Sequence, residues 1–192
     1  MKVIGFTGNY SAGEDAFPQS YLMADSSILF SGRPFFVPDF AQRFVARPSI
    51  IVRTGRLGKS IAPKFASRYW DAFTAGFSVQ ACEDSDERLG ALDRAFDGAA
   101  IVGDWVSVSS VDNALTTAVT LMVNGEEYAS CCLADMCHPL DELLAAVSTR
   151  CSIKMGDLLF TGDAGAAHEL APGDRLTATI AGQEVLDVKV RL

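Results

Sequence analysis

The feature that most constrains the fold of this 192-residue chain is a series of glycine turns that separate short apolar runs in its last third. Asn124-Gly125 joins the alternating run 115–123 to the run 126–132, and this dipeptide is typical of a two-residue hairpin because both positions accept positive φ angles. Turns of a similar kind recur at Pro172-Gly173-Asp174 and Ala181-Gly182. Short runs joined by such tight turns predict antiparallel strands.

Apolar and β-branched runs elsewhere in the chain indicate further strands. We expect strands at residues 3–7, 49–52, 73–79, 158–161, 175–180 and 184–190. Helices are few: residues 139–149 form the clearest amphipathic helix, and residues 65–73 form a second set of helical turns. The charge-rich stretch 82–98 is interpreted as a solvated connecting segment, with a helix N-terminus as the alternative. The pattern predicts an α+β, β-dominated fold.

Composition and charge narrow the class of protein. Hydrophobic residues make up 49% of the chain and charged residues 21%, and the length suits one domain over residues 1–192. A formal net charge of -8 argues against nucleic acid and anionic membranes as partners. We expect no membrane span and no signal peptide, because no apolar run is long enough. Five cysteines without a disulfide spacing favour reduced thiols and a cytoplasmic location.

Several motifs follow one another in a recognisable order. They are residues 53–66 (RTGRLGKSIAPKFA), 94–98 (RAFDG), 124–126 (NGE), 154–162 (KMGDLLFTG) and 170–174 (LAPGD). In this order they resemble the turn motifs of the fumarylacetoacetate hydrolase family, over nearly the whole chain. The resemblance implies a mixed β-roll with few helices that usually forms a homodimer.

The resemblance also implies a chemistry, the cleavage or rearrangement of a β-diketo or 2-oxo acid. In the family, Mg²⁺ or Mn²⁺ holds the oxo-carboxylate of the substrate and stabilises the enolate, so a cage of carboxylate ligands is needed. Counting back from residue 53 without gaps places the family's Glu-x-Glu pair at Arg47 and Ser49, on one face of a strand. The third ligand, an aspartate, falls on Ala81. We therefore expect no metal cofactor.

Other catalytic residues of the family are also replaced in this chain. The water-activating histidine and glutamate fall on Gly13 and Ala16, and the active-site lysine falls on Arg94, whose guanidinium stays charged. In the loop after residue 160, Thr161 and Gly162 are kept, whereas Asp163-Ala164 replaces Thr-Pro.

Two other metal sites remain open on sequence grounds. Acidic residues and one histidine could rebuild a site in the same loops: Glu14, Asp15, Asp163, His168 and Glu169. A zinc site is suggested by Cys131, Cys132, Cys137 and His138, but they lack the paired spacing of zinc ligands, so packed core thiols are favoured.

Replacing carboxylates by arginine changes the ligand that such a pocket attracts. Arg47 and Arg94 would give it a formal charge of about plus two, and arginine forks bind carboxylates bidentately. One hypothesis is that a small anionic 2-oxo acid is bound by Arg47, Ser49, Arg94, Thr161 and Gly162. The alternative is that both arginines form ion pairs with nearby acidic residues.

Three functions follow from these expectations. The first is a degenerate family member without the usual hydrolase activity that serves as a binding or partner subunit. The second is an active hydrolase, isomerase or decarboxylase that holds Mg²⁺ or Mn²⁺ through other ligands. The third is a metal-free tautomerase, decarboxylase or hydrolase in which Arg94 and Arg47 stabilise an enolate and Asp163 or Glu14 acts as the base.

Overall fold

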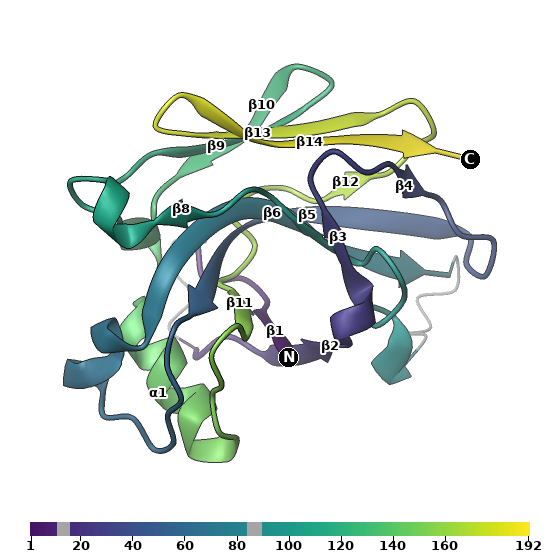
Figure 1. The fold of residues 1–192 in the computed structure, drawn as a ribbon. Coiled ribbons are helices and arrows are strands. Elements are labelled where there is room, and N and C mark those ends of the chain that lie inside the picture. The colour runs from purple at the N-terminus through teal and green to yellow at the C-terminus, as the bar shows by residue number, and fades with distance from the viewer. Residues whose placement is uncertain (11–15, 84–89) are drawn as a thin grey trace.

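The computed structural model describes residues 1–10, 16–83 and 90–192, which form two β-sheets and one α-helix (Figure 1). The helix, α1, covers Leu140–Arg150. The strands are β1 (Val3–Phe6), β2 (Ser20–Met23), β3 (Ile28–Phe30), β4 (Phe35–Phe36), β5 (Arg43–Thr54), β6 (Trp70–Cys82), β7 (Ala100–Val102), β8 (Val106–Ser107), β9 (Val119–Val123), β10 (Glu126–Cys131), β11 (Leu158–Phe160), β12 (His168–Glu169), β13 (Arg175–Ile180) and β14 (Gln183–Arg191). Short 3-10 helices lie at Asp25–Ser27, Pro63–Arg68, Gly90–Leu92, Val108–Ser110 and Leu133–Asp135.

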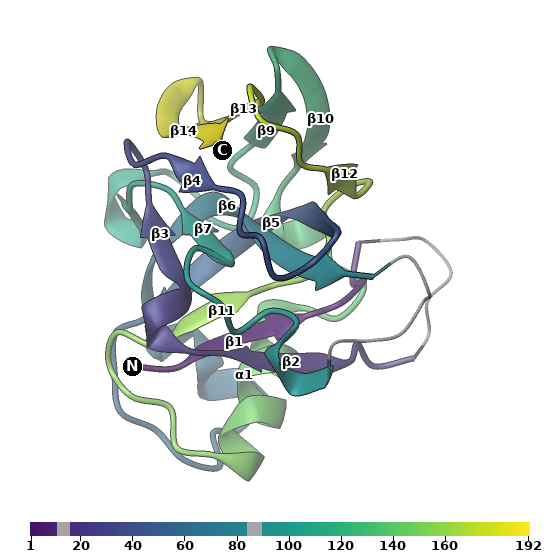
Figure 2. The same ribbon diagram turned by 90° about the vertical axis from the view of Figure 1, so that its right-hand side faces the viewer.

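The larger sheet is built around the long antiparallel pair β5 and β6. Its strand order is β2-β1-β11-β5-β6-β7-β3, with β12 also pairing with β5 and β8 with β6. The strands at the two ends of this order, β2 and β3, are joined only through the 3-10 helix Asp25–Ser27, so the sheet curls back on itself (Figure 2). The curl gives the sheet an inner face and an outer face.

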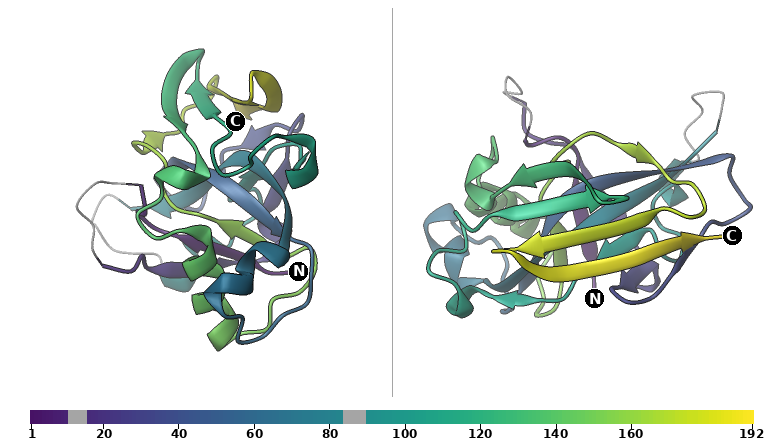
Figure 3. Two further views of the ribbon diagram at one scale, coloured as in Figure 1. Left: turned by 90° about the vertical axis from the view of Figure 1, so that its left-hand side faces the viewer. Right: turned by 90° about the horizontal axis from the view of Figure 1, so that it is seen from above.

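The outer face carries most of the hydrophobic core. The smaller sheet, of order β10-β9-β13-β14-β4, lies across β5 and β6 in the view from above (Figure 3), and α1 packs beside β1 and β11. Alternate residues of the long strands point outward, and Phe44, Ile50 and Phe77 are almost fully buried there. Burying one such side chain contributes about 1.5–3 kcal/mol.

The inner face is apolar at one end of the roll and polar at the other. Ile51, Val102 and Phe160 belong to a small cluster that fills the apolar end. Towards the other end, β5 places Arg47 and β6 places Ser78 and Gln80 on the same face, because Arg47 pairs with Ser78 and Val45 pairs with Gln80. The curl of the sheet therefore collects polar side chains at one mouth of the roll.

The fold confirms the predicted β-dominated class with few helices. The Asn124-Gly125 hairpin joins β9 to β10, and α1 covers nearly the predicted helix. The helical turns expected at residues 65–73 are wrong in extent, since the 3-10 helix ends at Arg68 and β6 begins at Trp70. Of the stretch 82–98, residues 84–89 lie outside the described residues, and the rest contains the 3-10 helix Gly90–Leu92. No helix in the described part of the chain is long and apolar enough to cross a membrane.

Candidate functional site

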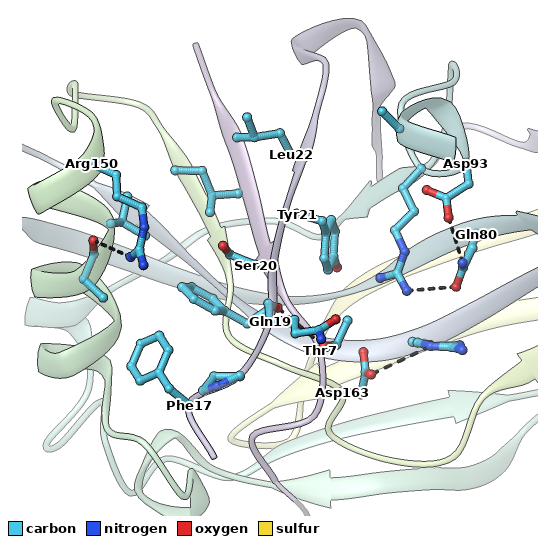
Figure 4. A pocket seen from close by; sticks show the side chains of 18 of the residues that line it. Thr7, Phe17, Gln19, Ser20, Tyr21, Leu22, Gln80, Asp93, Arg150 and Asp163 are labelled. Carbon is cyan, nitrogen blue, oxygen red and sulfur yellow. Dashed lines mark hydrogen bonds and ion pairs between the residues drawn. The ribbon is translucent and has the colours of Figure 1, made fainter. Parts of the chain in front are cut away.

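A cavity of about 1250 Å³ lies at the polar mouth of the roll and continues around β2 towards α1. The β1–β2 pair divides it, because side chains alternate across the pair. Tyr21 and its partner Gly5 face the inside of the roll, whereas Ser20 and Leu22 face α1, and Figure 4 shows Tyr21 and Ser20 on opposite sides of the strand. We call the two halves the polar part and the apolar part.

The two parts differ in chemistry. The polar part is lined by Tyr21, Arg47, Gln80, Asp93, Arg94 and Asp163. The apolar part is lined by Ile4, Phe6, Phe17, Ala146, Val147 and Cys151, with Arg150 as its only charged residue among the described lining. A ligand recognised by charge therefore belongs in the polar part.

Arg94 is the central cation of the polar part. Arg94 comes shortly after the 3-10 helix Gly90–Leu92 in the chain. Its side chain lies inside the roll, and the residue is 7% exposed. Nη2 donates to Oε1 of Gln80 over 2.8 Å, and Nη1 is buried without a hydrogen-bond partner. Among the described residues no carboxylate forms an ion pair with Arg94. A buried guanidinium without a counter-ion is costly and needs an explanation.

Tyr21 supports the guanidinium of Arg94 from one side. The Cζ atom of Arg94 lies 4.2 Å from the centre of the Tyr21 ring, within the range of a cation–π interaction. Glycine at position 5 makes room for this ring, since a Cβ there would lie 2.1 Å from Cζ of Tyr21. Burial raises the pKa of Tyr21, against the opposing charge of Arg94, so its hydroxyl stays neutral.

Gln80 links Arg94 to an acidic residue. Its Oε1 accepts from Arg94, and its Nε2 donates to Oδ2 of Asp93 over 2.8 Å (dashed lines in Figure 4). Each end of the amide therefore has a charged partner of the matching kind, which fixes its orientation. The Asp93 carboxylate is satisfied by the amide rather than by Arg94.

Arg47 and Asp163 form the second charged group of the polar part. Nε of Arg47 lies 3.7 Å from Oδ2 of Asp163, and the same oxygen accepts from the backbone N–H of Gly8 over 3.2 Å. Nη1 of Arg47 is buried without a hydrogen-bond partner. Asp163 thus offsets the charge of Arg47 and leaves one donor of its guanidinium unused.

Three of the five residues expected to bind the ligand do not line the cavity, namely Ser49, Thr161 and Gly162, and neither does Ala81, the position of the family's third metal ligand. Ser49 shares the inner face with Arg47, but it is 2% exposed and its hydroxyl donates to the carbonyl of Ile50. Ala81 pairs with Phe44 and points to the outer face, where it is 2% exposed in the main core. Side chains alternate along β6, so the neighbouring Gln80 faces the cavity where Ala81 does not.

Thr161 and Gly162 hold the loop in place. The hydroxyl of Thr161 donates to the carbonyl of Ile50 and contacts the hydroxyl of Tyr10 at 2.8 Å. Gly162 has a φ of 136°, and a Cβ there would lie 2.1 Å from the carbonyl oxygen of Gly8. Both residues join the 161–163 loop to the 8–10 loop, so their contribution to the site is to position Asp163.

Replacing Gly162 with alanine is expected to lower the free energy of unfolding by at least about 2 kcal/mol, because backbone strain is added to a steric clash. Gly173→Ala is the matched control, since Gly173 also has a positive φ but no atom lies within 4 Å of its added Cβ. Chemical denaturation of both variants measures the difference. Equal losses in the two variants would contradict the close approach of Gly162 to Gly8.

The other candidate metal groups are not assembled among the described residues. Nε2 of His168 binds Oδ2 of Asp174 at 2.8 Å, and Glu169 faces Arg43. His138 contacts Glu142, and burial raises the pKa of the Cys131 thiol to about 12. Gly13, Glu14 and Asp15 lie outside the described residues, whereas Ala16 lines a smaller hollow beside the cavity.

The donor atoms in the polar part do not fit Mg²⁺ or Mn²⁺. These ions prefer carboxylate oxygens, and a cage needs several that converge. Among the described residues the polar part has two carboxylates. Asp93 is bound to Gln80, Asp163 is bound to Arg47 and Gly8, and two guanidinium groups share the space. The described residues contain no group of three His, Cys, Asp or Glu side chains that could hold a metal ion.

The sequence did not indicate Tyr21, Gln80 or Asp93 as site residues. Strand alternation shows that only one of Gln80 and Ala81 faces the cavity, and the pairing of β6 with β5 decides that it is Gln80. No motif or spacing in the sequence marks Tyr21 or Asp93 as a site residue. They reach the site through the pairing of β1 with β2 and through the hydrogen bond to Gln80.

The chain resembles known proteins in sequence and in fold. The family model described as fumarylacetoacetate (FAA) hydrolase C-terminal matches residues 8–191. A mitochondrial oxaloacetate tautomerase of Caenorhabditis elegans is 22% identical over 162 residues, which is 82% of this chain and 76% of that protein. A bifunctional isomerase/decarboxylase of 4-hydroxyphenylacetate degradation from Escherichia coli is 22% identical over 89% of this chain but only 42% of that protein, so this chain spans less than half of its length.

Solved structures agree on the fold. The crystal structure of fumarylpyruvate hydrolase from Pseudomonas aeruginosa in complex with Mn²⁺ and pyruvate has a TM-score of 0.87 and 21% identity, covering 100% of this chain and 90% of that one. A 5-carboxymethyl-2-hydroxymuconate delta-isomerase from Mycobacterium smegmatis has a TM-score of 0.87 and 22% identity, covering 99% of this chain and 78% of that one.

Proposed function

The chain belongs to the fumarylacetoacetate hydrolase family, and from this premise we propose that it binds a small 2-oxo acid through arginine instead of through a metal ion. The observation that carries the proposal is the buried guanidinium of Arg94, which has no carboxylate partner among the described residues and one donor without an acceptor. The fumarylpyruvate hydrolase of Pseudomonas aeruginosa, which has the same fold, was crystallised with Mn²⁺ and pyruvate, so a 2-oxo acid is the first ligand to test.

Electrostatics supports a carboxylate ligand at Arg94. A buried charge is stabilised by an opposite charge that also accepts its hydrogen bonds, and a carboxylate meets both conditions for arginine. Tyr21 and Gln80 already fix the plane of the Arg94 guanidinium, so little conformational entropy is lost when a ligand binds. The ligand thereby acts as the counter-ion that the described residues do not supply to Arg94.

The same residues argue against the usual metal-dependent hydrolysis. Metal catalysis in the family requires an oxygen cage, and the inner face presents Arg47, Ser49 and Gln80 where such a cage would have to stand. We therefore propose a degenerate member of the family that has no hydrolase activity and acts by binding its ligand. No metal cofactor is part of this proposal.

A second candidate is a metal-free isomerase, tautomerase or decarboxylase. It is favoured by the carboxylate of Asp163, which shares the polar part with two guanidinium groups. In that case Asp163 takes a proton from the carbon next to the oxo group, and Arg94 stabilises the resulting enolate. Exchange of the pyruvate methyl protons in D₂O with EDTA present, followed by NMR, separates this enzyme from a binding protein.

We expect pyruvate to bind with the same dissociation constant in EDTA and in Mn²⁺, because arginine rather than metal holds its carboxylate. Isothermal titration calorimetry in the two buffers measures this, and thermal melting with Mn²⁺ alone should show no stabilisation. A pyruvate signal that requires Mn²⁺, or an increase in melting temperature caused by Mn²⁺ alone, would show instead that a rearranged site binds the metal ion, and would favour the metal-dependent enzyme.

We propose a homodimer as the assembly, on the strength of the family resemblance. Light scattering coupled to size-exclusion chromatography tests this independently of ligand binding. A mass equal to one chain at micromolar concentration would count against it.

A further inference from the structure

The charged groups of the polar part are not equivalent. The charge of Arg47 is offset by Asp163 at 3.7 Å, and Asp93 is bound to Gln80. Arg94 is the cation of the polar part that has no ion-pair partner among the described residues. The formal charge of about plus two expected from Arg47 and Arg94 is offset within the described lining, because Asp93 and Asp163 face the same space.

We infer that the polar part selects 2-oxo acids with a single carboxylate and rejects ligands with two. This inference rests on the proposed function and names the ligand class for the same site. The one carboxylate binds the guanidinium of Arg94, which lines the cavity and forms no ion pair with a described carboxylate. The neutral oxo group accepts a hydrogen bond from the guanidinium of Arg47, which lines the cavity and whose charge Asp163 already offsets.

Selection against a second carboxylate follows from Asp163. A second carboxylate at Arg47 would have to share that guanidinium with Asp163, whose Oδ2 is held in place by the N–H of Gly8. Two carboxylates on one cation repel each other, and solvent screens this repulsion only in part, because the side chains of Arg47 and Asp163 are 26% and 22% exposed. A neutral oxygen accepts the same hydrogen bond without this repulsion. Asp163 is thus a specificity-determining residue that occupies the place of a second ligand carboxylate.

Pyruvate and oxalate form a suitable pair of probes. They have the same number of non-hydrogen atoms, and oxalate carries a second carboxylate oxygen where pyruvate has its methyl group. Calorimetry on the intact chain in EDTA should give binding of pyruvate at least about tenfold tighter than binding of oxalate. Oxalate binding as tight as pyruvate binding would overturn the inference and leave the proposed function standing, whereas no binding of either probe would overturn both.

Asp163→Asn tests the cause of the preference. Asparagine can still accept from the N–H of Gly8 but carries no charge, so oxalate affinity should rise by about tenfold while pyruvate affinity changes little. Asp71→Asn is the matched control, because Asp71 pairs with Arg53 on the surface and does not line the cavity. This control removes the same net charge and should leave both affinities unchanged.

A double-mutant cycle identifies the cation involved. Adding Arg47→Met to Asp163→Asn should abolish the gain in oxalate affinity, because the second carboxylate then has no guanidinium to bind. A gain that persists without Arg47, or a single variant that shows no gain, would overturn the role given to Asp163. Melting temperatures and circular dichroism spectra of all variants confirm that each comparison is made between folded proteins.

Discussion

Replacing Arg94 with methionine is expected to weaken pyruvate binding strongly without lowering the stability of the protein. Each charge-assisted hydrogen bond that is lost is worth about 1.5–3 kcal/mol, so the dissociation constant of pyruvate should rise by a factor of about ten to a hundred for each bond. Stability should stay the same or rise, because Arg94 is a buried cation without a counter-ion among the described residues. Replacing buried ionic groups by apolar side chains of similar volume is often neutral or stabilising by about 1–4 kcal/mol.

This test is specific because the substitution should weaken pyruvate binding without lowering the free energy of unfolding. Calorimetry gives the affinity and chemical denaturation gives the free energy of unfolding. Arg53→Met is the matched control: Arg53 also lies over an aromatic ring, that of Trp105, but does not line the cavity. Its loss should leave pyruvate binding intact. If Arg94→Met unfolds the protein or binds pyruvate as well as the unchanged chain does, Arg94 is a structural residue and the proposed function fails.

The sequence predicted those parts of the fold that depend on local chemistry. The hairpin between β9 and β10 follows from two adjacent residues, Asn124 and Gly125, which both adopt positive φ angles. The helix α1 follows from its apolar spacing and from Pro139 ahead of its first turn. Longer elements were underestimated: β5 extends over Arg43–Thr54, although only residues 49–52 had a strongly β-branched sequence. The pairing of β5 with β6 and β11 supplies what local propensity does not.

The site was harder to predict because its chemistry comes from register and curl. One step along β6 separates Ala81, in the core, from Gln80, in the cavity, and no count along the sequence resolves that step without the pairing partner. The balance of charge also depends on the fold. Asp93 precedes Arg94 in sequence yet binds Gln80, and Asp163 reaches Arg47 only through the loop that Gly162 brings against Gly8.

Asp157 is expected to be the polar residue whose loss destabilises the fold most among those described. Its carboxylate is 0% exposed and joins β1 to β11. Oδ1 accepts from the backbone N–H of Lys2 over 2.8 Å, Oδ2 accepts from that of Lys154 over 2.7 Å, and the Lys2 ammonium pairs with the same carboxylate. Asp157→Ala would leave two backbone donors unsatisfied and should cost about 3–5 kcal/mol of unfolding free energy.

Asp71→Ala is the control for this change, because it removes a carboxylate that pairs with Arg53 at the surface, where such a pair is worth about 0–1 kcal/mol. Denaturation of both variants in urea measures the difference. Asp157→Ala should also weaken pyruvate binding in the protein that remains folded, since β1 carries Gly5, on which the ring of Tyr21 rests beneath Arg94. A loss below about 1 kcal/mol would contradict the role of Asp157 in holding β1. Unchanged binding in a strongly destabilised variant would show that the Tyr21 platform does not depend on that anchor.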